Sequence, residues 1–116
     1  MDKFTRAYIE AALWSSTDDE GEPLDSNYNE SDIAPETLRE MQADCKDFQE
    51  DFGELLYSAH LTSEQEGHNF WLTRNGHGTG FWDRGLGASG DALTAAAGEY
   101  GEYNLYVGDD GSIYGG

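Results

Sequence analysis

Apolar residues in the first half of the chain recur at helical spacing and predict two helices. One helix is expected over residues 2–15, with Asp2 as its cap and with apolar positions three and four residues apart: Phe4, Ala7, Tyr8 and Ala11. A longer one is expected from about 35 to 57, where the steps between apolar residues are 3, 4, 3, 4 and 3: Leu38, Met41, Cys45, Phe48, Phe52 and Leu55. Pro35 suits its first position. Both helices should bury one face.

Residues 17–32 are polar and acidic, and Gly21 and Pro23 interrupt them, so we expect a flexible acidic loop. Asp25, Asn27, Asn29, Ser31 and Glu36 occupy ligand offsets of a calcium-binding EF-hand loop. The position of that loop that requires glycine is occupied by Glu30. Gly21 and Pro23 also disfavour the helix that precedes the loop in an EF-hand. We therefore expect no calcium site.

The pattern changes after residue 62. Thr62 or Ser63 is expected to begin a short helical turn, with Gln65 and Glu66 at capping-box offsets and Gly67 at its end. The bulky residues 68–73 predict a strand, Asn75-Gly76 a tight turn, and residues 80–83 the returning strand. This segment is interpreted as a β-hairpin with a glycine-rich tip.

The last third predicts a helix and a second hairpin. A glycine-rich connection over 85–90 leads to a helix over 91–100, which Gly101 should close and which has one apolar face: Leu93, Ala96, Ala97 and Tyr100. Strands are expected over 103–107 and 112–114, joined by a turn over 108–111. The predicted fold class is α+β. Residues 1–116 should form one domain of N-terminal helices packed on a small antiparallel sheet built from two hairpins.

Fifteen aromatic residues in 116 are enough to build a core without disulfides or metal. The one cysteine, Cys45, lies in the apolar register of the second helix and should be a small buried hydrophobe. No apolar run approaches the roughly 18 residues of a membrane span, and residues 1–6 do not lead into the apolar stretch of a signal peptide. The cytoplasm is the expected location.

Charge is the strongest compositional signal. Asp and Glu number 24 against 6 Lys and Arg, a formal net charge of −18, and residues 1–66 hold 18 of the acids. Such a chain repels nucleic acid and anionic membranes and is attracted to basic surfaces. Direct binding to nucleic acid requires a basic patch, and none is evident. The expected partner is a protein with a basic surface.

The second predicted helix places six carboxylates in one row, about 120° around the helix from its apolar face. At 100° per residue they fall within an 80° arc and extend roughly 27 Å at 1.5 Å per residue: Glu36, Glu40, Asp44, Asp47, Asp51 and Glu54. Their mean spacing of about 5 Å is somewhat wider than the ~3.4 Å between phosphates of one DNA strand. Like charges four residues apart destabilise a helix. The row is either a solubilising surface or a mimic of a phosphate backbone.

Catalytic and cofactor motifs are not recognisable. Residues 74–80 are glycine-rich but lack the Lys-Ser/Thr ending of a phosphate loop, and Ser89 lacks the G-x-S-x-G context of a hydrolase nucleophile. His60, His68 and His77 are spaced by 8 and 9 residues, which matches no compact zinc motif. We expect no enzymatic activity, no cofactor and no metal.

Three runs of sequence look familiar: residues 9–16 (IEAALWSS), residues 70–83 (FWLTRNGHGTGFWD) and residues 105–111 (LYVGDDG). They resemble small acidic accessory proteins encoded by bacteriophages; the resemblance spans most of the chain, and the second run is its most specific part. The resemblance implies a phage origin and the host-cell cytoplasm. By analogy of class alone, it also implies an inhibitor of anti-restriction, anti-CRISPR or host-takeover type. It carries over no site residues.

Two functions follow as hypotheses. In the first, the acidic row occupies the basic channel of a host nucleic-acid-binding protein as a DNA mimic. In the second, a non-enzymatic phage accessory or virion-associated module binds through Trp71 and Trp82 of the predicted aromatic hairpin, and the acidity serves only solubility. A third interpretation of the acidity is adaptation to high salt, which implies no site.

Overall fold

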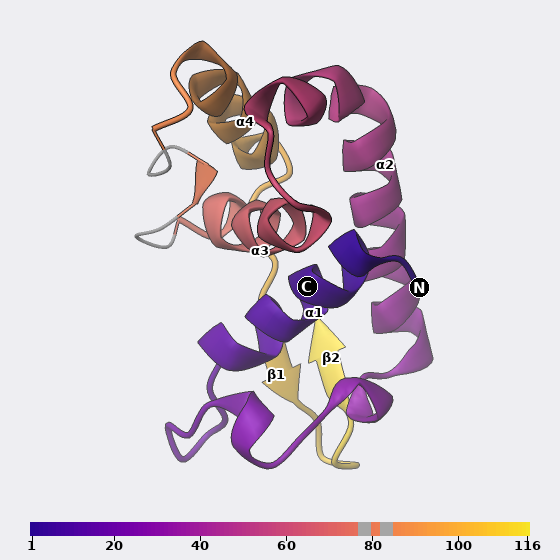
Figure 1. The fold of residues 1–116 in the computed structure, drawn as a ribbon. Helices are drawn as coiled ribbons and strands as arrows, with labels where there is room; N and C mark the ends of the chain where they lie inside the picture. Colours follow the sequence, from indigo (N-terminus) through magenta and orange to yellow (C-terminus); the bar gives the residue numbers. More distant parts are fainter. Residues whose placement is uncertain (77–79, 82–84) are drawn as a thin grey trace.

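The computed structural model describes residues 1–76, 80–81 and 85–116. This part of the chain contains four α-helices, two short 3₁₀ turns and one antiparallel strand pair (Figure 1). In chain order they are α1 (Lys3–Ser15), η1 (Leu24–Ser26), η2 (Glu30–Asp32), α2 (Pro35–Ala59), α3 (Ser63–Arg74), α4 (Ala88–Gly98), β1 (Leu105–Val107) and β2 (Ile113–Gly115). The α+β class is confirmed.

The first predicted helix is confirmed as α1. Its N-cap is Asp2, whose Oδ1 accepts a hydrogen bond from the backbone N–H of Thr5 at 2.8 Å. The other carboxylate oxygen, Oδ2, accepts from Gln49 Nε2 of α2 at 3.2 Å. A single carboxylate therefore both begins α1 and connects it to α2.

The cap makes the stability of the protein depend on pH. Burial raises the pKa of Asp2, but the hydrogen bonds from Thr5 and Gln49 outweigh burial and hold the pKa below its usual value. Because the pKa is lower in the folded state, the stabilisation is present above the unfolded pKa of about 4 and is lost as pH falls through the folded value.

Replacing Asp2 by Ala should lower the free energy of unfolding by about 1 kcal/mol at pH 7. Asp2→Asn keeps an acceptor for the N–H of Thr5, so it should lower the free energy of unfolding by less than Asp2→Ala does. Urea unfolding at pH 7 and pH 3 checks both variants, because the difference between wild type and Asp2→Ala should shrink at the lower pH. An unchanged difference would show that the carboxylate charge adds nothing to the cap.

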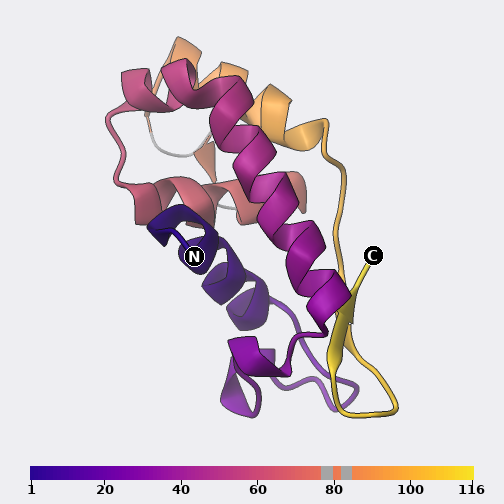
Figure 2. The ribbon, with the colours of Figure 1, turned by 90° about the vertical axis from the view of Figure 1, so that its right-hand side faces the viewer.

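The second predicted helix is confirmed as α2, with Pro35 in its first turn. It is the longest element and crosses both α1 and α3 (Figure 2). Met41, Cys45 and Phe48 are fully buried, as the apolar pattern predicted. Burial raises the pKa of the Cys45 thiol, which is consistent with a small core side chain rather than a nucleophile. The backbone is not helical at Phe52 (φ −122°, ψ 21°), so α2 bends there.

The strand predicted over residues 68–73 is wrong, because these residues belong to α3. The capping box at its start is confirmed: Thr62 Oγ1 accepts from the N–H of Gln65, and Gln65 Oε1 accepts from the N–H of Thr62. The helix does not end at Gly67 but continues to Arg74. Gly80 and Phe81 lie outside any strand, and the rest of the predicted return strand, residues 82 and 83, falls outside the described residues. The first of the two predicted hairpins is therefore not confirmed.

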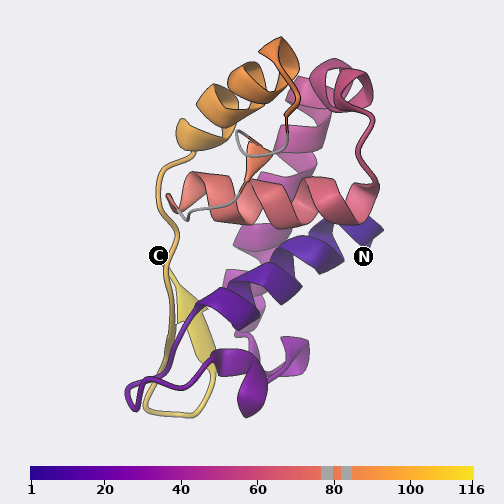
Figure 3. The ribbon, with the colours of Figure 1, turned by 60° about the vertical axis from the view of Figure 1, so that its left-hand side comes forward.

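Helices α1 and α3 lie side by side (Figures 1 and 3), and α2 covers them to complete an aromatic core. Phe48 of α2 stacks on Phe70 of α3 with ring centroids 4.1 Å apart. Tyr8 of α1 meets Phe70 at 5.2 Å and Trp71 edge-on at 5.3 Å. Such ring pairs add about 0.5–1.5 kcal/mol each beyond their buried area. Three helices distant in sequence are joined by these rings.

The C-terminal segments match their prediction closely. Helix α4 begins three residues before the predicted start and buries Leu93, Ala96 and Ala97 on the predicted face, but it ends at Gly98, so Tyr100 lies outside it. The hairpin pairs Tyr106 with Tyr114 across β1 and β2. It lies near the start of α2, where Ile113 O accepts from the N–H of Ala34 at 2.8 Å. The predicted packing of the N-terminal helices on the sheet is not confirmed, because the helices pack mainly on one another and the two-stranded sheet closes one end of the bundle.

Residues 17–32, predicted as a flexible acidic loop, contain the two 3₁₀ turns η1 and η2 and several backbone hydrogen bonds. The N–H of Leu24 donates to Ser16 O at 2.9 Å, and the Leu24 side chain is fully buried. Asn29 and Asp32 form a capping box around η2. The buried side chain of Leu24, the partly buried ring of Tyr28 and local hydrogen bonds therefore attach this acidic segment to the core.

Candidate functional site

The predicted carboxylate row, Glu36, Glu40, Asp44, Asp47, Asp51 and Glu54, is here called the acidic flank. All six residues lie on α2 and all but Asp44 are exposed. The bend at Phe52 separates Glu54 from the other five, so the regular helical spacing extends only from Glu36 to Asp51.

Two members of the acidic flank also hold the fold together. Asp44 Oδ2 accepts from Arg74 Nη1 at 2.8 Å, with the Arg74 side chain only 4% exposed and that of Asp44 29% exposed. Glu40 Oε1 accepts from the Tyr103 hydroxyl at 2.8 Å. The charge of Asp44 is thus balanced inside the protein. The charges directed to solvent are those of the other five.

The electrostatic effect of the acidic flank is evident at two neighbouring phenols. Burial, followed by the charges of Asp51, Asp47 and Asp44, raises the pKa of Tyr100. Burial, followed by the hydrogen bond to Glu40 and its charge, raises the pKa of Tyr103. Burial is the larger cause of both pKa shifts, and the negative potential of the acidic flank adds to it because it disfavours a phenolate. The flank is an acidic edge that borders the segment after α4.

Arg74 is the residue that sequence reasoning missed. Besides Asp44, it donates to the Tyr8 hydroxyl (2.9 Å), to Gly101 O (2.8 Å) and to Tyr100 O (3.1 Å). Its guanidinium carbon lies 5.4–5.7 Å from the ring centroids of three aromatic residues: Phe70, Tyr100 and Tyr103. Four of the buried residues of α3 follow helical spacing in the sequence: Gly67, Phe70, Trp71 and Arg74. This helical pattern is not recognised when Arg74 is counted as a polar surface residue.

Of the two tryptophans predicted as surface anchors, the structure describes only Trp71. Trp71 is 2% exposed, and its Nε1 donates to Ser15 Oγ at 2.7 Å, so it belongs to the core and is not available as a surface anchor in this fold. Trp82 lies outside the described residues. Of the two tryptophans among the described residues, Trp14 of α1 is the exposed one, at 57%.

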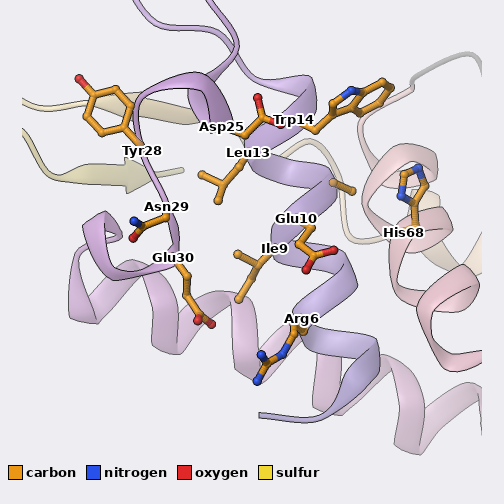
Figure 4. Close-up of a pocket in the computed structure, with 11 residues that line it drawn as sticks. Arg6, Ile9, Glu10, Leu13, Trp14, Asp25, Tyr28, Asn29, Glu30 and His68 are labelled. Atoms are coloured by element: carbon orange, nitrogen blue, oxygen red, sulfur yellow. The ribbon is translucent and has the colours of Figure 1, made fainter.

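Trp14 borders a groove of about 620 Å³ that the sequence did not predict. Figure 4 shows this groove between α1 and the segment from Asp25 to Glu30, with His68 of α3 beside Trp14. Its lining combines apolar side chains of α1 with several carboxylates. It could hold a small group or a side chain of a partner.

Within the described ranges, no cluster of three or more His, Cys, Asp or Glu side chains is placed to hold a metal ion. The helices described are all too short or too polar to cross a bilayer. Comparisons with protein-family models, curated proteins and solved structures return no match to this chain.

Proposed function

We propose that this protein is a phage-type inhibitory binding protein that presents the acidic flank to the basic nucleic-acid channel of a host protein in the host cytoplasm. The observation that carries the proposal is the row of five solvent-directed carboxylates on α2: Glu36, Glu40, Asp47, Asp51 and Glu54. A row of negative charges along a helix offers Lys and Arg side chains what a phosphate backbone offers them.

The attachment of α2 supports this role. The hydrogen bonds from Arg74 to Asp44 and from Tyr103 to Glu40 hold the middle of the acidic flank against the core. A row of charges that is already fixed in position loses less conformational entropy on binding. The net charge of −18 would also steer the protein toward a basic surface and speed encounter, an effect that salt weakens.

Capture from bacterial lysate on the immobilised protein tests the proposed class of partner. At low salt we expect a nucleic-acid-binding protein, such as a nuclease or polymerase subunit, and we expect added duplex DNA to displace it. Recovery of metabolic enzymes alone, or of a partner that DNA does not displace, would argue against mimicry.

A four-residue variant tests the acidic flank itself. The variant combines four substitutions: Glu36→Gln, Asp47→Asn, Asp51→Asn and Glu54→Gln. It removes four negative charges and leaves the contacts of Asp44 and Glu40 intact. Because like-charge repulsion is removed, stability should stay within about 0.5 kcal/mol of wild type or rise. Affinity for the captured partner should fall by about 100-fold or more, and its dependence on salt should flatten.

A matched control removes two Asp and two Glu from other elements: Asp19→Asn, Glu20→Gln, Glu64→Gln and Asp109→Asn. All four residues are exposed. The control has the same net charge as the flank variant, so it should lose only the general electrostatic steering. We expect its affinity for the captured partner to fall by no more than about tenfold. Equal losses in the two variants would show that overall charge, rather than the acidic flank, determines binding.

The alternative is a phage accessory module that binds through aromatic side chains and is acidic only for solubility. Of its two proposed anchors, Trp71 is buried and Trp82 lies outside the described residues. This alternative predicts that the flank variant binds as tightly as wild type and that Trp82→Ala does not bind.

A further inference from the structure

The groove beside Trp14 has the shape of a short trough along α1. Arg6, Glu10 and Trp14 are four residues apart on one face of the helix, so they extend along about 12 Å of it. Ile9 and Leu13 lie in the next row and form the apolar part of the lining. In Figure 4, Trp14 and Asp25 lie toward one end, and Arg6 and Glu30 toward the other. The trough is long enough for three or four extended residues.

The Trp14 end has the chemistry that recognises a cation. Trp14 is 57% exposed, and the centroid of its ring lies 6.1 Å from that of His68 in a tilted arrangement. A guanidinium or ammonium group is attracted to the face of an exposed indole. Carboxylates of Glu10 and Asp25 line the same region. An aromatic face bordered by carboxylates favours an arginine side chain, because its flat guanidinium can stack and donate hydrogen bonds at once.

The charge balance of the lining agrees with a cationic occupant. Three lining residues carry carboxylates, Glu10, Asp25 and Glu30, and one, Arg6, carries a guanidinium. At the far end, Glu30 Oε1 is buried and has no hydrogen-bond partner among the described residues. A buried carboxylate oxygen without a donor is unfavourable, so a bound donor at this end would be stabilised.

We infer that the groove receives a basic segment of the partner protein, with an arginine side chain at Trp14 and its guanidinium between the indole and the carboxylates of Glu10 and Asp25. The arginine stem packs on Leu13, and the next residues of the segment extend toward Glu30. The inference rests on the proposed function for its source of arginine, a basic protein. It adds a second contact surface, distinct from the acidic flank, on α1.

Titration of ¹⁵N-labelled protein with N-acetyl-arginine amide tests the site without the partner. The Trp14 indole N–H signal, assigned with Trp14→Phe, should shift in a saturable way, together with the signals of Glu10 and Asp25. N-acetyl-citrulline amide has nearly the same shape but no charge, and should cause no shift. N-acetyl-lysine amide should bind more weakly than the arginine analogue.

Trp14→Ala and Asp25→Asn should each weaken the binding of N-acetyl-arginine amide by at least about 5-fold. Both side chains are exposed, so both variants should fold, which the dispersion of their NMR spectra checks. The four-residue flank variant should bind the analogue as wild type does. Shifts scattered over all acidic residues, equal binding of citrulline, or unchanged affinity in Trp14→Ala would overturn the inference.

The two proposals can fail separately. If the captured partner depends on the acidic flank but binds Trp14→Ala and Asp25→Asn as tightly as wild type, the groove inference is wrong and the proposed function stands. If the arginine analogue binds at Trp14 but no nucleic-acid-binding protein is captured, the groove is a cation site and the proposed function is wrong.

Discussion

Replacing Arg74 by Met is expected to lower the free energy of unfolding by about 3–5 kcal/mol, a large part of the roughly 5–15 kcal/mol that holds a domain of this size together. Met fills a similar volume but donates no hydrogen bond. Four acceptors lose their donor at once: Asp44 Oδ2, Tyr8 Oη, Tyr100 O and Gly101 O. The loss is large because the Arg74 side chain is buried and its partners come from α1, α2 and the segment after α4.

Urea unfolding measures this loss, and two further variants locate its origin. Arg39→Met removes the same charge from an exposed position of α2 and should change stability by less than about 0.5 kcal/mol. Asp44→Asn keeps an acceptor for Arg74 and should cost less than Arg74→Met. If Arg74→Met is no less stable than Arg39→Met, the buried network does not determine the fold.

Gly67→Ala is expected to destabilise the protein by about 3 kcal/mol or more, although Ala is favoured over Gly in a helix by about 1 kcal/mol. A Cβ atom at Gly67 would meet the backbone of Phe4, with its carbonyl carbon 2.8 Å away and its oxygen closer still. The obstacle is main chain of α1, which no side-chain rotation removes. Helices α1 and α3 would have to separate, and the contacts between Tyr8, Phe70 and Trp71 would loosen.

Gly53→Ala is the matched control for this substitution. A Cβ at Gly53 of α2 meets nothing within 4 Å, and its φ is not positive. It should therefore leave stability unchanged or raise it by up to about 1 kcal/mol. Thermal or urea unfolding of the two variants should give changes of opposite sign. A neutral Gly67→Ala would mean that α1 and α3 do not approach as closely as the structure has them.

The importance of Arg74 affects how the acidic flank must be tested. Neutralising Asp44 together with the other carboxylates would weaken binding and folding at the same time, because Asp44 is also the charge partner of Arg74. The flank variant proposed above leaves Asp44 and Glu40 unchanged for this reason. A loss of binding in that variant can then be assigned to the surface.

Local sequence determined the elements that local physics stabilises. The apolar spacing of α2, the Asp2 cap of α1, the capping box at Thr62 and the turn over 108–111 each depend on residues a few positions apart. Hydrophobic periodicity and hydrogen bonds of this range are visible in the chain itself. The carboxylate row on α2 was predictable for the same reason from Glu36 to Asp51, whereas the bend at Phe52, which separates Glu54, was not.

Tertiary structure decided which residues that are distant in sequence contact one another. Residues 68–73 have the bulky side chains typical of a strand, but as a helix they place Gly67 against Phe4, Phe70 against Phe48 and Arg74 against Asp44. Those contacts join residues 22 to 63 positions apart and outweigh a local β preference of about 1 kcal/mol. Folding likewise determined that Asp44 is paired with Arg74, that Trp71 is buried, and that Trp14 borders a groove beside a segment whose sequence predicts a loop. Burial and charge pairing depend on which surfaces meet, and only the packed chain specifies that.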